Sequence, residues 1–272
     1  MKSKNKEDRV RVNLSPTSIN RYYKSPLLFY LTYIAKVPDD TVVPVCYGLS
    51  GNIVHDCLQR YAQREMTPDE AYLYLMQQWT DKRLNIHKDI NNRLLDQTDY
   101  LAAISRGMRI IEEHEEHICE ETFSFPFKQN EQIVIGIKGI VDLQARHKAS
   151  KQPVIIDYKT SNSVNTGKDF DRQALFYNYL VHKQKGLLPS STTFHYLKLG
   201  VSKRYCFTPI DMQAFEEELH ILAEEILKQG TDIANYPAGD IDDLFNAKKQ
   251  ACLNELTRRK TCELTLVPKS IF

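Results

Sequence analysis

The stretch of sequence that decides the fold is Pro153-Val154-Ile155-Ile156-Asp157-Tyr158-Lys159. It is short, strongly apolar and bounded by a polar turn at 148–152 and a polar loop at 160–167, which is typical of a strand at the centre of a sheet. Because side chains alternate along a strand, Asp157 and Lys159 are expected on the same face. A charged pair at the end of a buried strand is costly to desolvate, so this pair is the first candidate for a functional site.

A hairpin precedes this strand. Residues 122–143 contain an alternating segment and a β-rich run, joined by a polar turn at 128–131. Asp142 lies at the end of the β-rich run, and it comes to lie beside Asp157 if the two strands pair. A plain strand-end ion pair of these carboxylates with Lys159 explains the pattern equally well, since Asp-Xaa-Lys is short and occurs by chance.

Helical patterns account for most of the remaining chain. Ser15 and Pro16 form a helix start, because serine caps helix N-termini and proline is favoured at the first helical position. The predicted helices cover residues 17–34 with a break near Pro26, 48–64, 68–87, 93–120, 169–185 and 211–230. The predicted strands cover residues 122–127, 133–143, 153–159, 192–199 and 203–207. This order predicts an α/β protein with a mixed β-sheet flanked by helices.

The composition indicates which broad classes of protein the chain can belong to. With 272 residues, 42% hydrophobic and 26% charged, the chain can form one large domain or a core domain with helical additions. It has no apolar run long enough for a membrane span, and residues 1–11 lack the apolar stretch of a secretory signal. The six cysteines form no CxxC pair, which favours reduced, mostly buried thiols. We therefore expect a cytoplasmic protein with no membrane association.

The net charge of +1 does not mark the chain as a nucleic-acid binder, but the charges are unevenly distributed. Residues 1–36 hold eight Lys or Arg residues against two acidic ones, and residues 246–260 hold five against one. These basic segments could together line a phosphate-binding groove. They could equally be ordinary solvated surface, and charge alone does not decide.

Two carboxylates next to a lysine have a definite chemistry. Carboxylate oxygens are hard ligands that suit Mg²⁺ or Mn²⁺. A divalent cation held by Asp142 and Asp157 would polarise a phosphate and help to generate a hydroxide nucleophile. Lys159 would orient the attacking water or stabilise the pentavalent phosphorane.

Five motifs in order extend this constellation. They are Leu14-Ser15-Pro16-Thr17-Ser18-Ile19-Asn20-Arg21-Tyr22 with Ser25-Pro26-Leu27-Leu28-Phe29, then Gly48-Leu49-Ser50-Gly51-Asn52-Ile53-Val54-His55, Gly139-Ile140-Val141-Asp142, Ile155-Ile156-Asp157-Tyr158-Lys159-Thr160 and Gln173-Ala174-Leu175-Phe176-Tyr177. Together they closely resemble the PD-(D/E)XK nuclease superfamily, and specifically its RecB-type branch, which includes the CRISPR adaptation exonucleases. The resemblance covers roughly residues 14–200. Each motif is weak alone, and their order and spacing make the match specific.

The resemblance implies a restriction-endonuclease-like core with a metal site. It makes His55, Asp142 and Asp157 the metal ligands, with the backbone carbonyl of Tyr158 as a further ligand. Lys159 would be the catalytic lysine. The helix pattern alone makes His55 a packed core histidine, because it lies next to an apolar stripe.

Gln173 and Tyr177 are four residues apart and so share one face of a helix. The resemblance places them near the active site, where they position Lys159 or the DNA backbone. Without it, they are helix surface and a core tyrosine. Glu121 is near where relatives often carry an acidic residue, and it can equally be surface charge.

Two other patterns are set aside. Many members of the branch carry an iron–sulfur cluster, held by one Cys before the proline of the first motif and three near the C-terminus. Here the first position is Ser25 and the tail offers only Cys252 and Cys262, so we expect no cluster. The run 114–117 (His-Glu-Glu-His) is not a zinc motif, because its histidines are three residues apart, and we interpret it as a solvated helix face.

The implied activity is metal-dependent hydrolysis of DNA phosphodiester bonds, by an exonuclease or a flap- or end-processing enzyme acting on single strands or duplex ends. The basic segments would hold the strand. No helicase motif is present, so unwinding would need a helicase or another DNA-processing partner. A non-cleaving nucleic-acid-binding or scaffold subunit and a hydrolase of another phosphoester are the alternatives. Strand preference, DNA against RNA, and oligomeric state stay open.

The same interpretation divides the chain into three parts. Residues 1–120 form an N-terminal helical region that contributes the metal-binding His55. Residues 121–210 form the nuclease core, and residues 211–272 form a C-terminal helix and tail that pack on the core.

Overall fold

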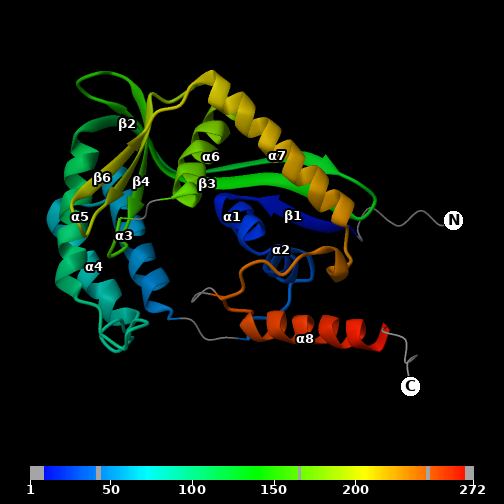
Figure 1. Ribbon diagram of the computed structural model, residues 1–272. Helices are drawn as coiled ribbons and strands as arrows, with labels where there is room; N and C mark the ends of the chain where they lie inside the picture. The colour runs from blue at the N-terminus through cyan, green and yellow to red at the C-terminus, as the bar shows by residue number, and fades with distance from the viewer. Residues whose placement is uncertain (1–8, 41–43, 165–166, 243–245, 267–272) are drawn as a thin grey trace. The chain divides into compact units, whose positions relative to one another are not determined.

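The computed structural model describes residues 9–40, 44–164, 167–242 and 246–266, with side chains as far as residue 260 (Figure 1). Two compact units are built from residues 1–43, 125–137 and 221–272, and from residues 44–124 and 138–220. Three elements, β2 (His114–Gln129), β3 (Ile133–His147) and α7 (Pro209–Gln229), contribute residues to both units. The basic residues Lys2, Lys4 and Lys6 and the side chain of Cys262 lie outside the described residues.

The first unit begins with a strand that the sequence did not predict. In it, β1 (Val10–Leu14) pairs in parallel with the start of β3. Ser15 then caps α1 (Pro16–Lys24) in a capping box with Ser18. After Ser25 the chain continues as α2 (Pro26–Phe29) and the π-helical turn η2 (Tyr30–Ile34), so the predicted break near Pro26 is confirmed.

The C-terminal tail belongs to the same unit, and it contains the short helix η3 (Ile233–Asn235) and α8 (Lys249–Leu266). A small apolar cluster is formed by Leu27, Leu28, Leu31, Ile241 and Cys252. Arg258 and Arg259 donate hydrogen bonds to the Glu255 carboxylate at 2.7–2.8 Å, so part of the basic C-terminal segment is neutralised within the unit.

The second unit contains a mixed sheet, as the sequence predicts. β3 pairs antiparallel with β4 (Pro153–Lys159), and β4 pairs in parallel with β5 (Ser191–Tyr196). β5 pairs antiparallel with β6 (Val201–Tyr205), and β2 pairs with β3. The decisive strand, β4, has the predicted bounds at both ends.

Helices cover both faces of this sheet. α3 (Cys46–Ala62), α4 (Pro68–Asp81) and α5 (Gln97–Glu112) share one core with Ile156 and Tyr158 of β4 (Figure 1). On the other face, α6 (Lys168–Lys185) packs its Phe176 and Tyr179 against Phe215 of α7. Because side chains alternate, Asp157 and Lys159 lie on the face covered by α6.

Two predicted helices are too long. The helices expected at 68–87 and 93–120 end at Asp81 and Glu112, and β2 begins at His114. The run 114–117 is therefore not a solvated helix face but the start of a strand. His114 is buried, and its Nδ1 lies 2.7 Å from the carbonyl oxygen of Ile110. Histidine and glutamate do not alternate in this run, and of its four residues only His114 is buried, while Glu116 is exposed.

None of the helices in the described part of the chain combines the length and apolar character that a membrane-spanning helix requires. The division of the chain at residues 120 and 210 stays a prediction.

Candidate active site

Three side chains from three elements of the second unit converge at one point. His55 Nδ1 of α3 lies 3.3 Å from Asp142 Oδ2 of β3 and 3.9 Å from Glu120 Oε1 of β2. One ligand atom from each residue lies within 4.8 Å of the other two. The two carboxylates offer hard oxygen ligands and the imidazole offers a nitrogen ligand, so the residues present fit a divalent cation.

The predicted pairing of strands places Asp142. In the antiparallel ladder, Leu143 is opposite Ile156, which brings Asp142 level with the end of β4. The backbone N–H of Tyr158 donates to Asp142 Oδ2 at 2.9 Å. The Tyr158 ring packs edge-on against the His55 ring, with centroids 6.1 Å apart. Tyr158 therefore orients two of the three clustered side chains, and the ligand role of its own carbonyl stays a prediction.

Glu120 is the residue that the sequence missed by one position. The neighbouring Glu121, which the sequence singled out, bonds the side chains of Lys185 and Gln144. Adjacent residues of a strand face opposite sides, so only one of the two can reach His55. The strand was predicted to begin at residue 122, and only a strand that begins at His114 shows which glutamate faces the cluster.

Asp157 and Lys159 form a buried ion pair next to this cluster, with Lys159 Nζ 2.7 Å from Asp157 Oδ2. The side chain of Asp157 is 3% exposed and that of Lys159 is 18% exposed. Asp157 is not one of the three clustered ligand residues, and its predicted ligand role stays a prediction. The alternative of an ion pair alone does not account for His55 and Glu120 converging on Asp142.

A second network holds the amine of Lys159. Lys159 Nζ donates to Gln173 Oε1 at 3.1 Å, and Gln173 Nε2 donates to the Tyr177 hydroxyl at 2.7 Å. The ammonium group also lies 4.7 Å from the ring centroid of Phe194 and 6.0 Å from that of Phe170. These contacts leave the lysine few alternative rotamers. Gln173 and Tyr177 therefore contact the Asp157–Lys159 pair through side chains of α6.

Charge sets the protonation of the histidine. Burial lowers the pKa of His55, but the charge of Asp142 and its hydrogen bond outweigh burial and raise this pKa to about 9. Burial disfavours the Asp142 carboxylate, yet the His55 imidazolium and the Tyr158 N–H hold the pKa of Asp142 below its ordinary value. If His55 is to bind a cation through its Nδ1, it would have to lose this proton.

The pKa values of Asp157, Glu120 and Tyr177 are raised instead. Burial raises the pKa of Asp157 to about 6, against the opposing charge of Lys159. Burial followed by the charge of Asp142 raises the pKa of Glu120. The pKa of Tyr177 lies well above its usual value because of burial and the charges of Asp157 and Asp142, so its hydroxyl keeps its proton. The site concentrates more negative charge than its neighbours neutralise, which is what a cation site requires.

A cavity of about 480 Å³ opens beside the cluster and is lined by His55, Glu120 and the first turns of α3. Gly48 and Gly51 lie on its wall. A Cβ added at Gly51 would lie 3.3 Å from Thr160 Oγ1, so the helix backbone approaches the loop after β4 closely. Gly51 therefore permits this close approach, because a Cβ at that position would crowd the Thr160 side chain.

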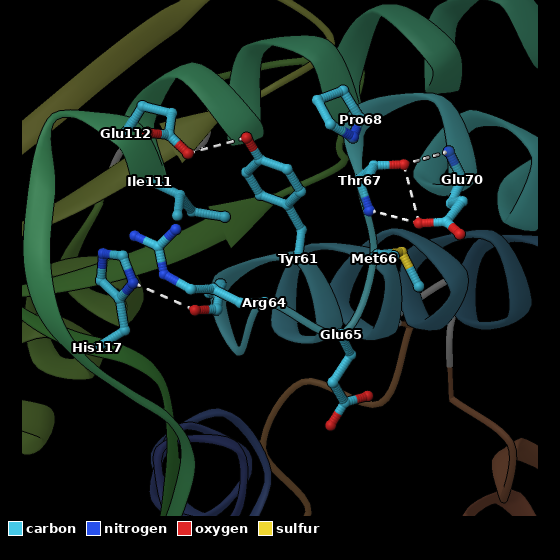
Figure 2. Close-up of a pocket in the computed structure, with 11 residues that line it drawn as sticks. Tyr61, Arg64, Glu65, Met66, Thr67, Pro68, Glu70, Ile111, Glu112 and His117 are labelled. Carbon is cyan, nitrogen blue, oxygen red and sulfur yellow. Dashed lines mark hydrogen bonds between the residues drawn. The ribbon is translucent and has the colours of Figure 1, made fainter.

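Another cavity, of about 330 Å³, lies at the C-terminal end of α3 and is separate from this site (Figure 2). His117 lines it and its Nδ1 is 3.3 Å from the Ala62 carbonyl oxygen, while Tyr61 donates to Glu112 at 2.9 Å. None of the predicted site residues lines this cavity.

Comparison with known proteins decides the family. The family model described as the PD-(D/E)XK nuclease superfamily matches residues 13–253. The chain belongs to the PD-(D/E)XK nuclease superfamily. The five motifs lie within the matched residues, and the resemblance inferred from the sequence is confirmed at this level. The assignment of this PD-(D/E)XK protein to the RecB-type branch stays a prediction.

Two solved structures are similar. A provisionally assigned exonuclease from Eubacterium rectale is 11% identical, with a TM-score of 0.47 over 83% of this chain and 84% of that one. The protein SSO0001 is 15% identical, with a TM-score of 0.34 over 85% of this chain and 92% of that one. No curated protein matches the sequence of this superfamily member.

The sequence also predicts that this protein carries no iron–sulfur cluster. Ser25, at the position where cluster-bearing relatives carry cysteine, accepts a hydrogen bond from the Leu28 N–H and so caps α2. Cys252 is buried in the first unit. The expected absence of an iron–sulfur cluster stays a prediction.

Proposed function

We propose that this PD-(D/E)XK protein is a nuclease that depends on Mg²⁺ or Mn²⁺ and hydrolyses DNA phosphodiester bonds, as an exonuclease or a flap- or end-processing enzyme. The observation that carries the proposal is the convergence of His55, Glu120 and Asp142 beside a buried, oriented lysine. A cation site next to a fixed amine is what phosphodiester hydrolysis needs to stabilise charge on phosphorus.

The residues have separate roles in this proposal. His55, Glu120 and Asp142 would hold the cation, and Asp157 and the Tyr158 carbonyl are further candidate ligands. When bound, the cation polarises a phosphate oxygen and lowers the pKa of water. Asp142 is already aimed by the Tyr158 N–H, so little reorganisation is needed on binding.

Lys159 is the proposed catalytic residue. Its ammonium group donates hydrogen bonds to the attacking water or to the phosphate oxygens as negative charge builds on them. Water forms the new bond to phosphorus, the ester P–O bond breaks, and the water proton ends on the leaving oxygen. Gln173 accepts from the amine and donates to Tyr177, so these two are positioning residues.

The test is cleavage of end-labelled single- and double-stranded DNA with Mg²⁺, Mn²⁺ or EDTA. Lys159→Ala is compared with Lys183→Ala, a half-exposed lysine of α6 that pairs with Glu216 at 2.6 Å. We expect cleavage that needs the metal, is lost in Lys159→Ala and persists in Lys183→Ala. Metal-independent cleavage, or equal activity of the two variants, would contradict the proposal. A folded protein that cleaves neither DNA nor RNA would favour a non-cleaving scaffold.

The basic N-terminal segment, and the part of the basic C-terminal segment that is not neutralised by neighbouring carboxylates, are proposed to hold the DNA strand. Action in the cytoplasm and unwinding by a helicase or another DNA-processing partner stay predictions. Lengths of the labelled products separate exonuclease from endonuclease action and give the polarity.

A further inference from the structure

A cavity of about 390 Å³ lies between α5 and the β5–β6 hairpin in the second unit. No residue of the metal-ligand cluster and none of the predicted site residues lines it. Figure 1 shows α5 and β6 next to each other at the edge of the sheet. The size is that of a cavity for a small organic ligand rather than for a single ion.

The charge of this cavity comes from one face of α5. Arg106 and Arg109 are three residues apart and therefore neighbours on that face, while Ile104 and Met108 of the same helix are buried in the core. Within the described part of the chain, no carboxylate forms an ion pair with either guanidinium. Glu113 lines the same cavity one turn further along and is exposed.

Arg106 is held in place before any ligand arrives. Its Nη1 donates to the carbonyl oxygens of Leu197 and Lys198, at 2.6 and 3.0 Å. Gly200 in the β5–β6 turn has a φ of 66°, and a Cβ there would lie 3.3 Å from Arg106 Nε. The turn therefore packs directly against the guanidinium and fixes its plane. The remaining N–H groups of Arg106 are left for other acceptors.

The opposite wall supplies neutral hydrogen-bonding groups. Ser202 Oγ lies 2.7 Å from His195 Nδ1. Burial, followed by the nearby His114, lowers the pKa of His195 to about 4, so the ring is neutral at physiological pH. When the serine hydroxyl donates to Nδ1, the ring proton is on Nε2, and the imidazole becomes a donor on that side.

We propose that this cavity binds a nucleotide through its terminal phosphate monoester, with Arg106 and Arg109 as the anchors. A monoester is close to a dianion, which two guanidinium groups match, whereas a phosphodiester carries a single charge. Ile110 and Val201 form an apolar wall for the base or sugar, and Glu113 is an acceptor for a sugar hydroxyl. The ligand chemistry is shared by a free mononucleotide and by the phosphorylated end of a DNA strand.

The test measures binding in EDTA, which removes divalent cations from the metal-ligand cluster. The probes are deoxyadenosine 5′-monophosphate, deoxyadenosine, and an eight-nucleotide DNA strand with or without a 5′-phosphate, titrated by calorimetry. Arg109→Gln is the test variant, because Arg109 is exposed and makes no structural contact like that of Arg106. Arg64→Gln, an exposed arginine at the separate cavity of Figure 2, is the matched control.

We expect phosphate-dependent binding that weakens about tenfold in Arg109→Gln, the loss of one charge-assisted contact, and is unchanged in Arg64→Gln and Lys159→Ala. Binding of the mononucleotide supports a free ligand, and binding of the phosphorylated strand alone supports a strand end. Equal binding of deoxyadenosine and its monophosphate would overturn the proposal. So would binding lost in Lys159→Ala but kept in Arg109→Gln, or no binding of any probe at millimolar concentration.

Discussion

His55 and His195 are partly buried histidines of the same unit, yet their surroundings give them opposite charge states. Three carboxylates, those of Asp142, Asp157 and Glu120, raise the pKa of His55 to about 9 against the effect of burial. Around His195, burial and His114 lower the pKa to about 4, and the charged neighbours in its cavity include two arginines. We therefore propose a cation as the ligand of the first region and an anion as the ligand of the second. The difference teaches that burial and the charged groups around a histidine, not the histidine itself, decide what each region can bind.

The largest expected effect is on the rate of DNA cleavage, which should depend on His55 and not on His195. His55→Ala removes the only nitrogen of the metal-ligand cluster, and we expect DNA cleavage to fall about 100-fold or more. His195→Ala leaves that cluster intact and should change the rate by less than about threefold. Steady-state cleavage at saturating Mn²⁺ measures both. Equal losses of cleavage rate in the two variants would contradict a role for His55 that His195 does not share.

The next prediction distinguishes Glu120, a member of the metal-ligand cluster, from its neighbour Glu121. Glu120→Gln should weaken Mn²⁺ binding about 10- to 100-fold, because a charged ligand becomes a neutral one. Glu121→Gln should leave Mn²⁺ binding unchanged and lower the free energy of unfolding by about 1 kcal/mol or less, through its lost ion pair with Lys185. Titration of Mn²⁺ by electron paramagnetic resonance, with urea unfolding, checks both. Weaker Mn²⁺ binding in Glu121→Gln would return that residue to the site.

The metal-free protein should show opposite pH dependences at the two histidines. The pKa of His55 is raised, so its contribution to the free energy of unfolding is full below pH 6.5 and is lost as the pH rises towards 9. The pKa of His195 is lowered, so its contribution is full above pH 6.5 and is lost as the pH falls towards 4. Each effect should be about 1–2 kcal/mol, since both rings keep some contact with solvent.

Urea unfolding in EDTA at several pH values, with His55→Gln and His195→Gln, measures this contrast. His55→Gln should remove the loss of stability on the alkaline side, and His195→Gln should remove the loss on the acid side. Matching pH profiles for the two variants would mean that the two histidines do not differ in charge state.

The parts of this molecule that the sequence predicts well are those specified by local pattern. β4 has the expected bounds because an apolar run between polar turns has few other solutions. The strand of Asp142 pairs with β4 as expected, and Gln173 and Tyr177 lie on the predicted helix. Their convergence on Lys159 was inferred from the family resemblance, since helix spacing alone does not say what a helix face contacts.

Two kinds of feature could not be predicted from the sequence: those that depend on contacts between distant residues, and strands whose alternating side chains are mostly polar. The polar start of β2 resembles a solvated helix, so the strand was placed eight residues late and Glu121 was considered instead of Glu120. β1 is only five residues long, and its hydrogen bonds go to residues more than a hundred positions away. The arginines of α5 and His195 are likewise far apart in sequence, and no spacing rule connects them.

The smallest expected effect compares one glycine from each region. Gly48 lies within α3 at the cavity beside His55, and a Cβ there would have no atom within 4 Å. Gly48→Ala should therefore raise the free energy of unfolding by about 0.5–1 kcal/mol, because alanine is the better helix former. Gly200 has a φ of 66°, which strains any other residue, and its Cβ would crowd Arg106. Gly200→Ala should lower the free energy by about 1 kcal/mol. Urea unfolding measures both changes. If the two variants changed the free energy of unfolding in the same direction, the turn that packs against Arg106 would not be a constrained part of the cavity between α5 and the β5–β6 hairpin.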